Sequence, residues 1–401
     1  MNLIRFWLPA LAFVILASLT YVKFSEKSRS LHEQISKLDS HLDTPLNLLD
    51  EGFNISERHE AKDSKFDIPK MKEGDLDAAF FAVFLSQKLR TEENTEASYV
   101  KAHRIIDSIE IMAKRYDNDL VLAYKASDLS NIKNENKRAI YIGMENGFPL
   151  GTKLNRVEEF YNRGVRYITL SHTLNNDICD SSTDEPEHNG LSSFGKDVVK
   201  EMNRLGMMID VSHISDSAFY NVLSLSDAPV VASHSSVRSL CNHPRNLNDH
   251  MIKALAEKNG VVQICLLSDY IVAADTTTEN YRLKEALRVK YNNYQFKTDE
   301  EKSQAWSAWH EIEMNYPTDK ATVSQAVDHI DYVVNLVGID YVGIGSDFDG
   351  GGGLADCRDI SEFPNITAEL VTRGYSNIDI EKIWSGNFLR VFSSVESKAT
   401  K

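Results

Sequence analysis

Residues 207–234 read MMIDVSHISDSAFYNVLSLSDAPVVASH. Two short apolar runs, Met207–His213 and Pro229–His234, each end in a histidine and enclose a segment of helical character, Asp216–Leu225. Near-continuous apolar runs of this length are typical of parallel strands that are covered on both faces. The stretch therefore predicts a strand–helix–strand unit whose two histidines lie at the carboxyl ends of parallel strands.

The same pattern recurs along the rest of the chain. Six further apolar runs are Ile35–Asp43, Ala78–Leu85, Ala139–Glu145, Arg166–His172, Val261–Leu267 and Tyr341–Asp347. Helical segments between runs include Arg156–Arg163, Gly195–Leu205, Asp249–Lys258 and Thr322–Leu336. Eight strands alternating with helices predict a (β/α)8 TIM barrel, whose active site lies at the carboxyl ends of the strands. The competing fold, a doubly wound open sheet, would place a glycine-rich phosphate loop after the first strand, and the sequence has none there.

The amino terminus predicts export. Residues Phe6–Val22 are mostly apolar and are flanked by Arg5 and Lys23, which fits a signal peptide or a single membrane anchor. No small-x-small cleavage site follows the apolar run, so an uncleaved hydrophobic helix is favoured. We therefore divide the chain into a leader or anchor (1–24), a polar linker (25–34) and a barrel domain (35–401). The domain would be anchored on the outer or periplasmic side, or secreted if the leader is cleaved.

A long gap separates the seventh and eighth runs. Within it, residues 276–315 are polar, and Leu283, Leu287 and Tyr291 fall at helical spacing. This pattern predicts a helical insertion between strands 7 and 8. An insertion that follows a strand lies on the active-site face, where it could form a lid, a subunit contact or a solvated decoration.

Composition excludes several function classes. The 401 residues carry 44 Lys and Arg against 59 Asp and Glu, a net charge of −15, which argues against nucleic-acid binding. The four cysteines lack metal-site spacing, although disulfides remain open in an exported protein. No Gly-x-Ser-x-Gly elbow is present, and Cys179 has no adjacent base in the sequence, so neither a serine nor a thiol nucleophile is indicated.

Polar residues at the ends of the runs form a candidate metal site. His41 and Asp43 are two apart on one predicted strand and therefore face the same way. Together with residues at the ends of three further runs they make a set of three imidazoles and two carboxylates: His41, Asp43, Glu145, His213 and His234. This set suits zinc, with manganese, cobalt or iron as alternatives. It suffices for two ions if Glu145 bridges them.

Three more residues are candidates for chemistry beside the metals. Asp347 ends the last run, where a carboxylate could take and return a proton. His172 could be a sixth ligand, an oxyanion donor or a structural histidine. Arg245, after the sixth run, could clamp a substrate carboxylate or form a surface salt bridge.

These motifs resemble those of the membrane (renal-type) dipeptidases, a family within the metal-dependent hydrolase superfamily of TIM barrels. The matching segments are DSHLDTP (39–45), IGMENG (142–147), TLSHT (169–173), IDVSH (209–213), SHSS (233–236), PRN (244–246), GSDFDG (345–350) and GNFLRVF (386–392). They span nearly the whole of the chain after the leader. The family usually has Gly and Asn around the first histidine and a glycine at position 146, where this chain has Ser40, Leu42 and Asn146.

The resemblance implies a zinc-dependent dipeptidase that uses a hydroxide held between two zinc ions. It implies that His41 and Asp43 bind one zinc, that His213 and His234 bind the other, and that Glu145 bridges both. His172 and Arg245 would contact the dipeptide, at the scissile carbonyl and the terminal carboxylate respectively, and Asp347 would shuttle the proton. A homodimer is also implied. Two alternatives are a related binuclear metallohydrolase acting on another amide or a lactone, and a binding protein with an inert site.

Overall fold

The computed structural model describes residues 26–291 and 298–400. Their strands form one sheet: β1 (Leu38–Leu42), β2 (Ala78–Phe84), β3 (Leu120–Leu122), β4 (Arg138–Glu145), β5 (Val165–Thr169), β6 (Met208–Asp210), β7 (Val231–Ser235), β8 (Val261–Cys265) and β9 (Val342–Gly345). Eight strands follow one another in the order β1-β2-β4-β5-β6-β7-β8-β9, and their pairings are parallel. A bridge between Leu42 and Phe348 joins the two ends of this order. The sheet is therefore a nearly closed parallel barrel, as the alternation of strands and helices predicts.

The strands differ from the predicted runs in two respects. The short strand β3 pairs with the first half of β4 and was not predicted, because three residues carry no recognisable period. In addition, β5, β6 and β9 end before the polar residues that were expected to terminate them. His172, His213 and Asp347 therefore lie in the loops that leave the barrel.

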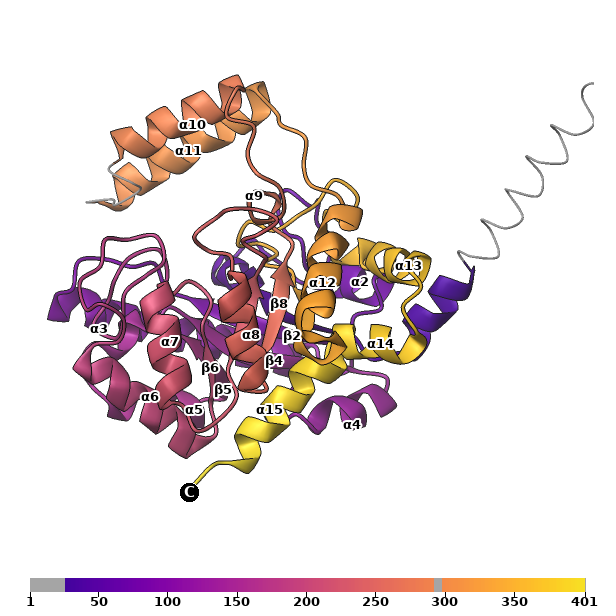
Figure 1. Cartoon of the computed structure of the whole chain (residues 1–401), viewed down its shortest axis with the longest axis horizontal. Coiled ribbons are helices and arrows are strands. Elements are labelled where there is room, and N and C mark those ends of the chain that lie inside the picture. The colour runs from indigo at the N-terminus through magenta and orange to yellow at the C-terminus, as the bar shows by residue number, and fades with distance from the viewer. Residues whose placement is uncertain (1–25, 292–297, 401) are drawn as a thin grey trace, which may run out of the picture.

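Helices surround the barrel (Figure 1). The α-helices are α2 (Ile68–Glu73), α3 (Glu92–Arg115), α4 (Asp128–Asn134), α5 (Asn155–Asn162), α6 (Ser193–Leu205), α7 (Asp216–Leu225), α8 (Asp249–Glu257), α9 (Ser268–Ile271), α10 (Glu279–Lys290), α11 (Asp299–Asn315), α12 (Val323–Val337), α13 (Pro364–Thr372), α14 (Asn377–Glu381) and α15 (Asn387–Ser397). Short 3-10 turns are η1 (Thr44–Leu49), η2 (Phe148–Leu150), η3 (Ile339–Tyr341) and η4 (Ile360–Glu362), and a π-turn, η5 (Lys382–Gly386), leads into α15. The five helices predicted from sequence correspond to α5, α6, α7, α8 and α12.

An aromatic layer fills the barrel below the site. The ring of Phe80 stacks on those of Tyr141 and Tyr167, at centroid distances of 4.8 and 5.3 Å, and Phe388 of α15 meets it edge-on. Gly143 makes room for this layer, because a Cβ there would lie 2.2 Å from the ring of Tyr167. The filled interior directs polar chemistry to the carboxyl ends of the strands.

The segment before β1 is not the linker that its polarity suggests. Residues 26–34 are helical, and Leu31 and His32 within them are buried. The ring of His32 bonds the hydroxyl of Thr367 at 2.6 Å and the carbonyl of Gly74 at 2.9 Å, while the buried ammonium of Lys37 donates to the carbonyl of His32 at 2.5 Å. These partners are distant in sequence, so local polarity could not reveal them. The predicted hydrophobic helix of 1–24 lies outside the described residues, and no helix within them is long and apolar enough to cross a membrane.

The insertion is helical, as predicted. Helices α10 and α11 pack on each other and form a hairpin that stands away from the barrel (Figure 1). It leaves the barrel after β8 and returns before α12, on the face that holds the strands' carboxyl ends. The four cysteines are all buried and free, so the structure contains no disulfide among them.

Candidate metal centre and active site

The structure brings the five predicted metal ligands together at one end of the barrel. His41 lies in β1 and Asp43 follows it, Glu145 ends β4, His234 lies in β7, and His213 lies in the loop after β6. All five side chains are buried, with at most 6% of their surface exposed. Three groups of side chains hold potential ligand atoms within 4.8 Å of one another: His41, Glu145 and His234; Glu145, His172 and His213; and His41, Asp43 and Asp347.

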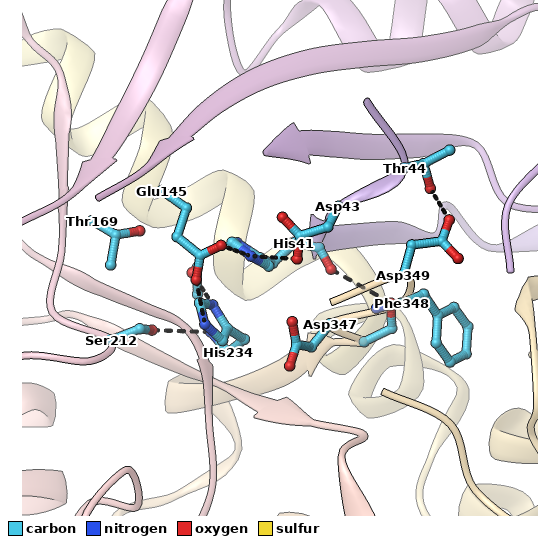
Figure 2. Close-up of polar contacts among 12 residues, drawn as sticks. His41, Asp43, Thr44, Glu145, Thr169, Ser212, His234, Asp347, Phe348 and Asp349 are labelled. Carbon is cyan, nitrogen blue, oxygen red and sulfur yellow. Dashed lines mark hydrogen bonds and ion pairs between the residues drawn. The ribbon is translucent and has the colours of Figure 1, made fainter. Parts of the chain in front are cut away.

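The two oxygens of Glu145 face different ligands. Oε1 lies 3.0 Å from Nε2 of His213 and 3.5 Å from Nε2 of His234. Oε2 lies 3.5 Å from Nε2 of His41, which in turn lies 3.7 Å from Oδ2 of Asp43. Figure 2 shows the Glu145 carboxylate between His41 and His234. The two oxygens of one carboxylate therefore face different imidazoles within a single cluster, as those of a bridging ligand would.

The loops hold two of these residues in an uncommon backbone conformation. His213 has a φ of 69° and Asp347 a φ of 57°, in the left-handed region that residues with a Cβ seldom adopt. Such conformations cost free energy and persist where the surrounding structure requires them, often at functional sites. Both residues lie in the loops that follow β6 and β9.

The imidazoles opposite Glu145 favour the neutral form that binds metals. Burial, and then the charge of Arg245, hold the pKa of His213 well below its ordinary value. Burial and the nearby His41 lower the pKa of His234 as well. Burial lowers the pKa of His172 to about 4. An uncharged ring keeps a lone pair for a ligand bond.

The surroundings of the two carboxyl groups shift their pKa values in opposite directions. Burial and the charge of Glu145 raise the pKa of Asp43 well above its ordinary value. Burial opposes ionisation of Glu145 too, but the surrounding imidazoles, His41 first, hold its pKa well below the usual range. For His41, burial is outweighed by Tyr167 and Glu145, so its pKa is raised. Buried acids crowded in this way are relieved by a cation.

Two buried donor atoms without hydrogen-bond partners also favour a bound cation. Nε2 of His41 and Oδ1 of Asp43 are buried and have no hydrogen-bond partner in the described part of the chain. An unsatisfied buried polar atom costs about 1–3 kcal/mol, so such atoms call for a partner. Nitrogen and oxygen donors at these positions fit one or two transition-metal ions.

Three predicted residues surround this cluster. His172 lies with Nε2 3.7 Å from Oε1 of Glu145, and its ring meets that of Phe84 edge-on. The buried guanidinium of Arg245 donates to the carbonyl of His234 at 3.0 Å. It lies 5.3 Å from the ring centroid of Tyr270, and its Nε has no partner among the described residues. Of the two sequence alternatives for Arg245, the surface salt bridge is wrong, because the side chain is buried and forms no ion pair within the described residues.

Asp347 and Asp349 have different surroundings although they are two residues apart. Asp347 shares a group with His41 and Asp43, and the thiol of Cys265 lies 3.7 Å from its Oδ2. Asp349 instead accepts hydrogen bonds from the hydroxyl of Thr44 at 2.6 Å and the amide of Lys65 at 2.7 Å. Asp349 thus ties the loop together, and Asp347 is the acid that faces the cluster (Figure 2).

Comparison with known proteins decides the family. The model for the family described as membrane dipeptidase (peptidase family M19) matches residues 25–401. The chain belongs to the membrane dipeptidase family. Dipeptidase tcpJ of Claviceps purpurea is 32% identical to this dipeptidase over 339 residues, 83% of this chain and 70% of that protein. Dipeptidase 3 of Mus musculus is 29% identical over 390 residues, 94% of this chain and 68% of that protein.

A solved structure agrees with this assignment. The probable dipeptidase PvdM from Pseudomonas aeruginosa is 33% identical and superposes with a TM-score of 0.85, covering 94% of this chain and 99% of that one. The protein is thus a dipeptidase of the M19 metallopeptidases, a metal-dependent family, and the described part of the chain contains candidate metal-binding clusters.

The departures of this M19 dipeptidase from the familiar motifs have structural explanations. The hydroxyl of Ser40 is buried and donates to the carbonyl of Ser233 at 2.7 Å, and Leu42 is part of the hydrophobic core. Asn146 has a φ of 75°, a conformation that glycine adopts freely and asparagine tolerates better than most residues. Its side chain also donates to the carbonyl of Leu85 at 2.9 Å.

Sequence reasoning missed several residues that contact the candidate ligands. Tyr167 bonds the ring of His41, Ser233 bonds that of His234, and Asp210 receives the hydroxyl of Ser233. Tyr270 lies against Arg245. Asp210 did carry a signal, since a carboxylate inside an apolar run is costly to bury without partners.

Proposed function

We propose that this dipeptidase is zinc-dependent and binds two zinc ions per chain. His41 and Asp43 would hold one ion, His213 and His234 the other, and Glu145 would bridge them. The observation that supports this arrangement is the orientation of the Glu145 carboxylate. Its Oε1 faces His213, and its Oε2 faces His41. Two zinc ions there would acidify a water molecule and polarise the substrate carbonyl, which is the chemistry that hydrolysis of an amide needs at neutral pH.

The remaining side chains would bind the dipeptide and move protons. Asp347, beside His41 and Asp43, would accept the proton of the attacking water and deliver it to the leaving amine. His172 would donate a hydrogen bond to the carbonyl oxygen as negative charge develops there. Burial lowers the pKa of His172 to about 4, so the ring is neutral at pH 7 and donates through its single N–H.

Arg245 would set the length of the substrate. Its buried guanidinium lies next to His234, and a fixed cation at this depth can pair with the terminal carboxylate of a substrate that ends one residue past the scissile bond. A longer peptide would place an uncharged amide there and leave the charge unpaired, which is expensive in a buried site.

Hydrolysis of a dipeptide panel tests this proposal. The purified full chain would be assayed as isolated, after chelation, and after addition of zinc, manganese or cobalt, with the bound metal counted in each state. Loss of activity with the chelator and recovery with two equivalents of zinc support the proposal. A chain that holds two metal ions and cleaves no dipeptide refutes it, and would move attention to other amides and to lactones.

We further propose that residues 1–24 direct export, that the protein is anchored outside the cytoplasm or secreted, and that it forms a homodimer. The support is the apolar run Phe6–Val22 between Arg5 and Lys23. Protease treatment of intact cells tests the location. Digestion of the domain only after the inner compartment is opened would contradict it.

A further inference from the structure

Two hydrogen-bonded relays back the histidines of the proposed metal centre, one behind His41 and one behind His234. The Nδ1 atom of His41 lies 2.8 Å from the hydroxyl of Tyr167, and that hydroxyl lies 3.1 Å from the carbonyl of Ser40. The Nδ1 atom of His234 lies 2.9 Å from the hydroxyl of Ser233, and that hydroxyl lies 2.6 Å from Oδ2 of Asp210. In both rings it is Nε2 that faces Glu145.

The last atom of each relay decides which groups donate and which accept its hydrogen bonds. A peptide carbonyl such as that of Ser40 only accepts, so Tyr167 must donate to it and can then only accept from Nδ1 of His41. Asp210 also only accepts. It receives the hydroxyls of Thr169 and Ser233 on one oxygen and the amides of Ser212 and Ser233 on the other. Both oxygens of Asp210 thus act as acceptors, so Ser233 donates to this carboxylate and accepts from Nδ1 of His234.

We infer that Tyr167 and the Ser233–Asp210 pair are positioning residues that hold His41 and His234 in the tautomer with the proton on Nδ1 and a free lone pair on Nε2. This inference rests on the proposed binuclear site. A histidine must present an unprotonated nitrogen to a metal, and a hydrogen bond to its other nitrogen fixes the ring and raises its basicity. Each relay serves one ion: Tyr167 the His41–Asp43 ion, and Ser233 the His213–His234 ion.

The two relays differ chemically. The His234 relay ends on a buried carboxylate, whereas the His41 relay ends on a neutral carbonyl. His213 has no such support, because its buried Nδ1 lacks a partner among the described residues. The ion at His213 and His234 therefore depends on a single relay, while the ion at His41 also has the carboxylate of Asp43. Loss of the Ser233 hydroxyl should therefore lower the zinc affinity at His213 and His234 more than loss of the Tyr167 hydroxyl lowers the zinc affinity at His41 and Asp43.

Metal titration of the chelated full-length protein tests the inference without using activity. Competition with a chromophoric chelator measures the zinc affinity of each equivalent in the wild type, Tyr167→Phe, Ser233→Ala and the double variant. We expect each single variant to weaken one equivalent by about 10–100-fold and to leave the other within about threefold. The double variant should weaken both. Ser233→Thr keeps a hydroxyl and should restore the affinity that Ser233→Ala loses.

Matched controls separate positioning from stability. Tyr141→Phe removes a buried hydroxyl from the same aromatic layer, where it donates to the carbonyl of Lys125 at 3.0 Å. Ser226→Ala removes a buried hydroxyl that donates to the carbonyl of Ala228. Thermal unfolding of the metal-free forms measures how much stability the loss of a buried hydroxyl removes in each variant. Both control variants should bind the two zinc equivalents with wild-type affinity.

The outcomes distinguish the inference from the function on which it rests. A wild type with two equivalents and relay variants that bind zinc unchanged would overturn the inference alone. The inference alone would also be overturned if the control variants weakened zinc binding as much as the relay variants do. A wild type that binds fewer than two equivalents would overturn the proposed binuclear site, and the inference with it.

Discussion

A single methyl group at Gly350 should disable the site. A Cβ at this position would lie 2.1 Å from Oδ2 of Asp43 and 2.4 Å from Oδ1 of Asp347. Real Cβ contacts are not shorter than 3.0 Å, so Gly350→Ala must push these oxygens away by roughly 0.9 and 0.6 Å. The carboxylate that would hold an ion and the one that would move the proton are thus displaced together.

The loop cannot retreat to avoid this clash. The amides of Gly350 and Gly352 both donate to the carbonyl of Asp347, at 3.1 and 2.7 Å, and the amide of Gly353 donates to the carbonyl of Leu266 at 2.8 Å. Because misplacement by about 1 Å can cost about 100-fold in rate, we expect kcat/KM to fall at least ~100-fold, which corresponds to about 2.7 kcal/mol of transition-state stabilisation. Affinity for the ion at His41 and Asp43 should fall as well.

The assay compares Gly350→Ala with Gly386→Ala. The control adds the same methyl group where the nearest atom, the carbonyl oxygen of Glu381, is 3.6 Å away, an ordinary contact. Dipeptide hydrolysis, bound metal and thermal unfolding would be measured for both variants and the wild type. If Gly350→Ala kept its metal and hydrolysed dipeptides within about threefold of the wild-type rate, the reasoning from steric contact would be refuted.

Three further predictions concern other residues. Asp347→Asn should lower kcat by about 10²–10⁴-fold while the bound metal stays near two equivalents, because the amide cannot take a proton; a rate near that of the wild type would exclude the proton shuttle. Arg245→Ala should raise KM and lower kcat/KM most for dipeptides with a free terminal carboxylate, and an equal loss on amidated dipeptides would contradict the clamp. His32 is 2% exposed and burial lowers its pKa to about 4, so its contribution to stability is present above pH 6.5 and is lost as the pH falls towards 4. Over that range the chelated wild type should lose roughly 3 kcal/mol more unfolding free energy than His32→Gln, and denaturant titrations that give parallel pH profiles would show that His32 is not the group responsible.

The residues of the site could be predicted because each follows an apolar run. A parallel barrel gathers the carboxyl ends of its strands at one rim, so His41, Glu145 and His234 are neighbours once the fold is known. The insertion could also be predicted, because its apolar residues repeat with the helical period and need no partner on the barrel to reveal it.

Other features depend on contacts between residues far apart in the sequence. The helix at 26–34 is polar enough to look like a linker, and it is ordered by the burial of His32 against Thr367 and Gly74. The strand β3 exists because β4 offers it an edge. Neither contact leaves a local pattern.

By itself, the sequence predicted the eight strands of the barrel and five of its helices, the rim on which the polar residues lie, and the candidate metal-binding side chains, because periodicity and residue type are local properties. Only the tertiary structure decided how those side chains act together. It turned the two oxygens of Glu145 towards different imidazoles, brought Gly350 against Asp43 and Asp347, and placed Tyr167 and Ser233 behind His41 and His234. These relations are distances through space between different strands, and a linear pattern contains no such distances until the barrel closes.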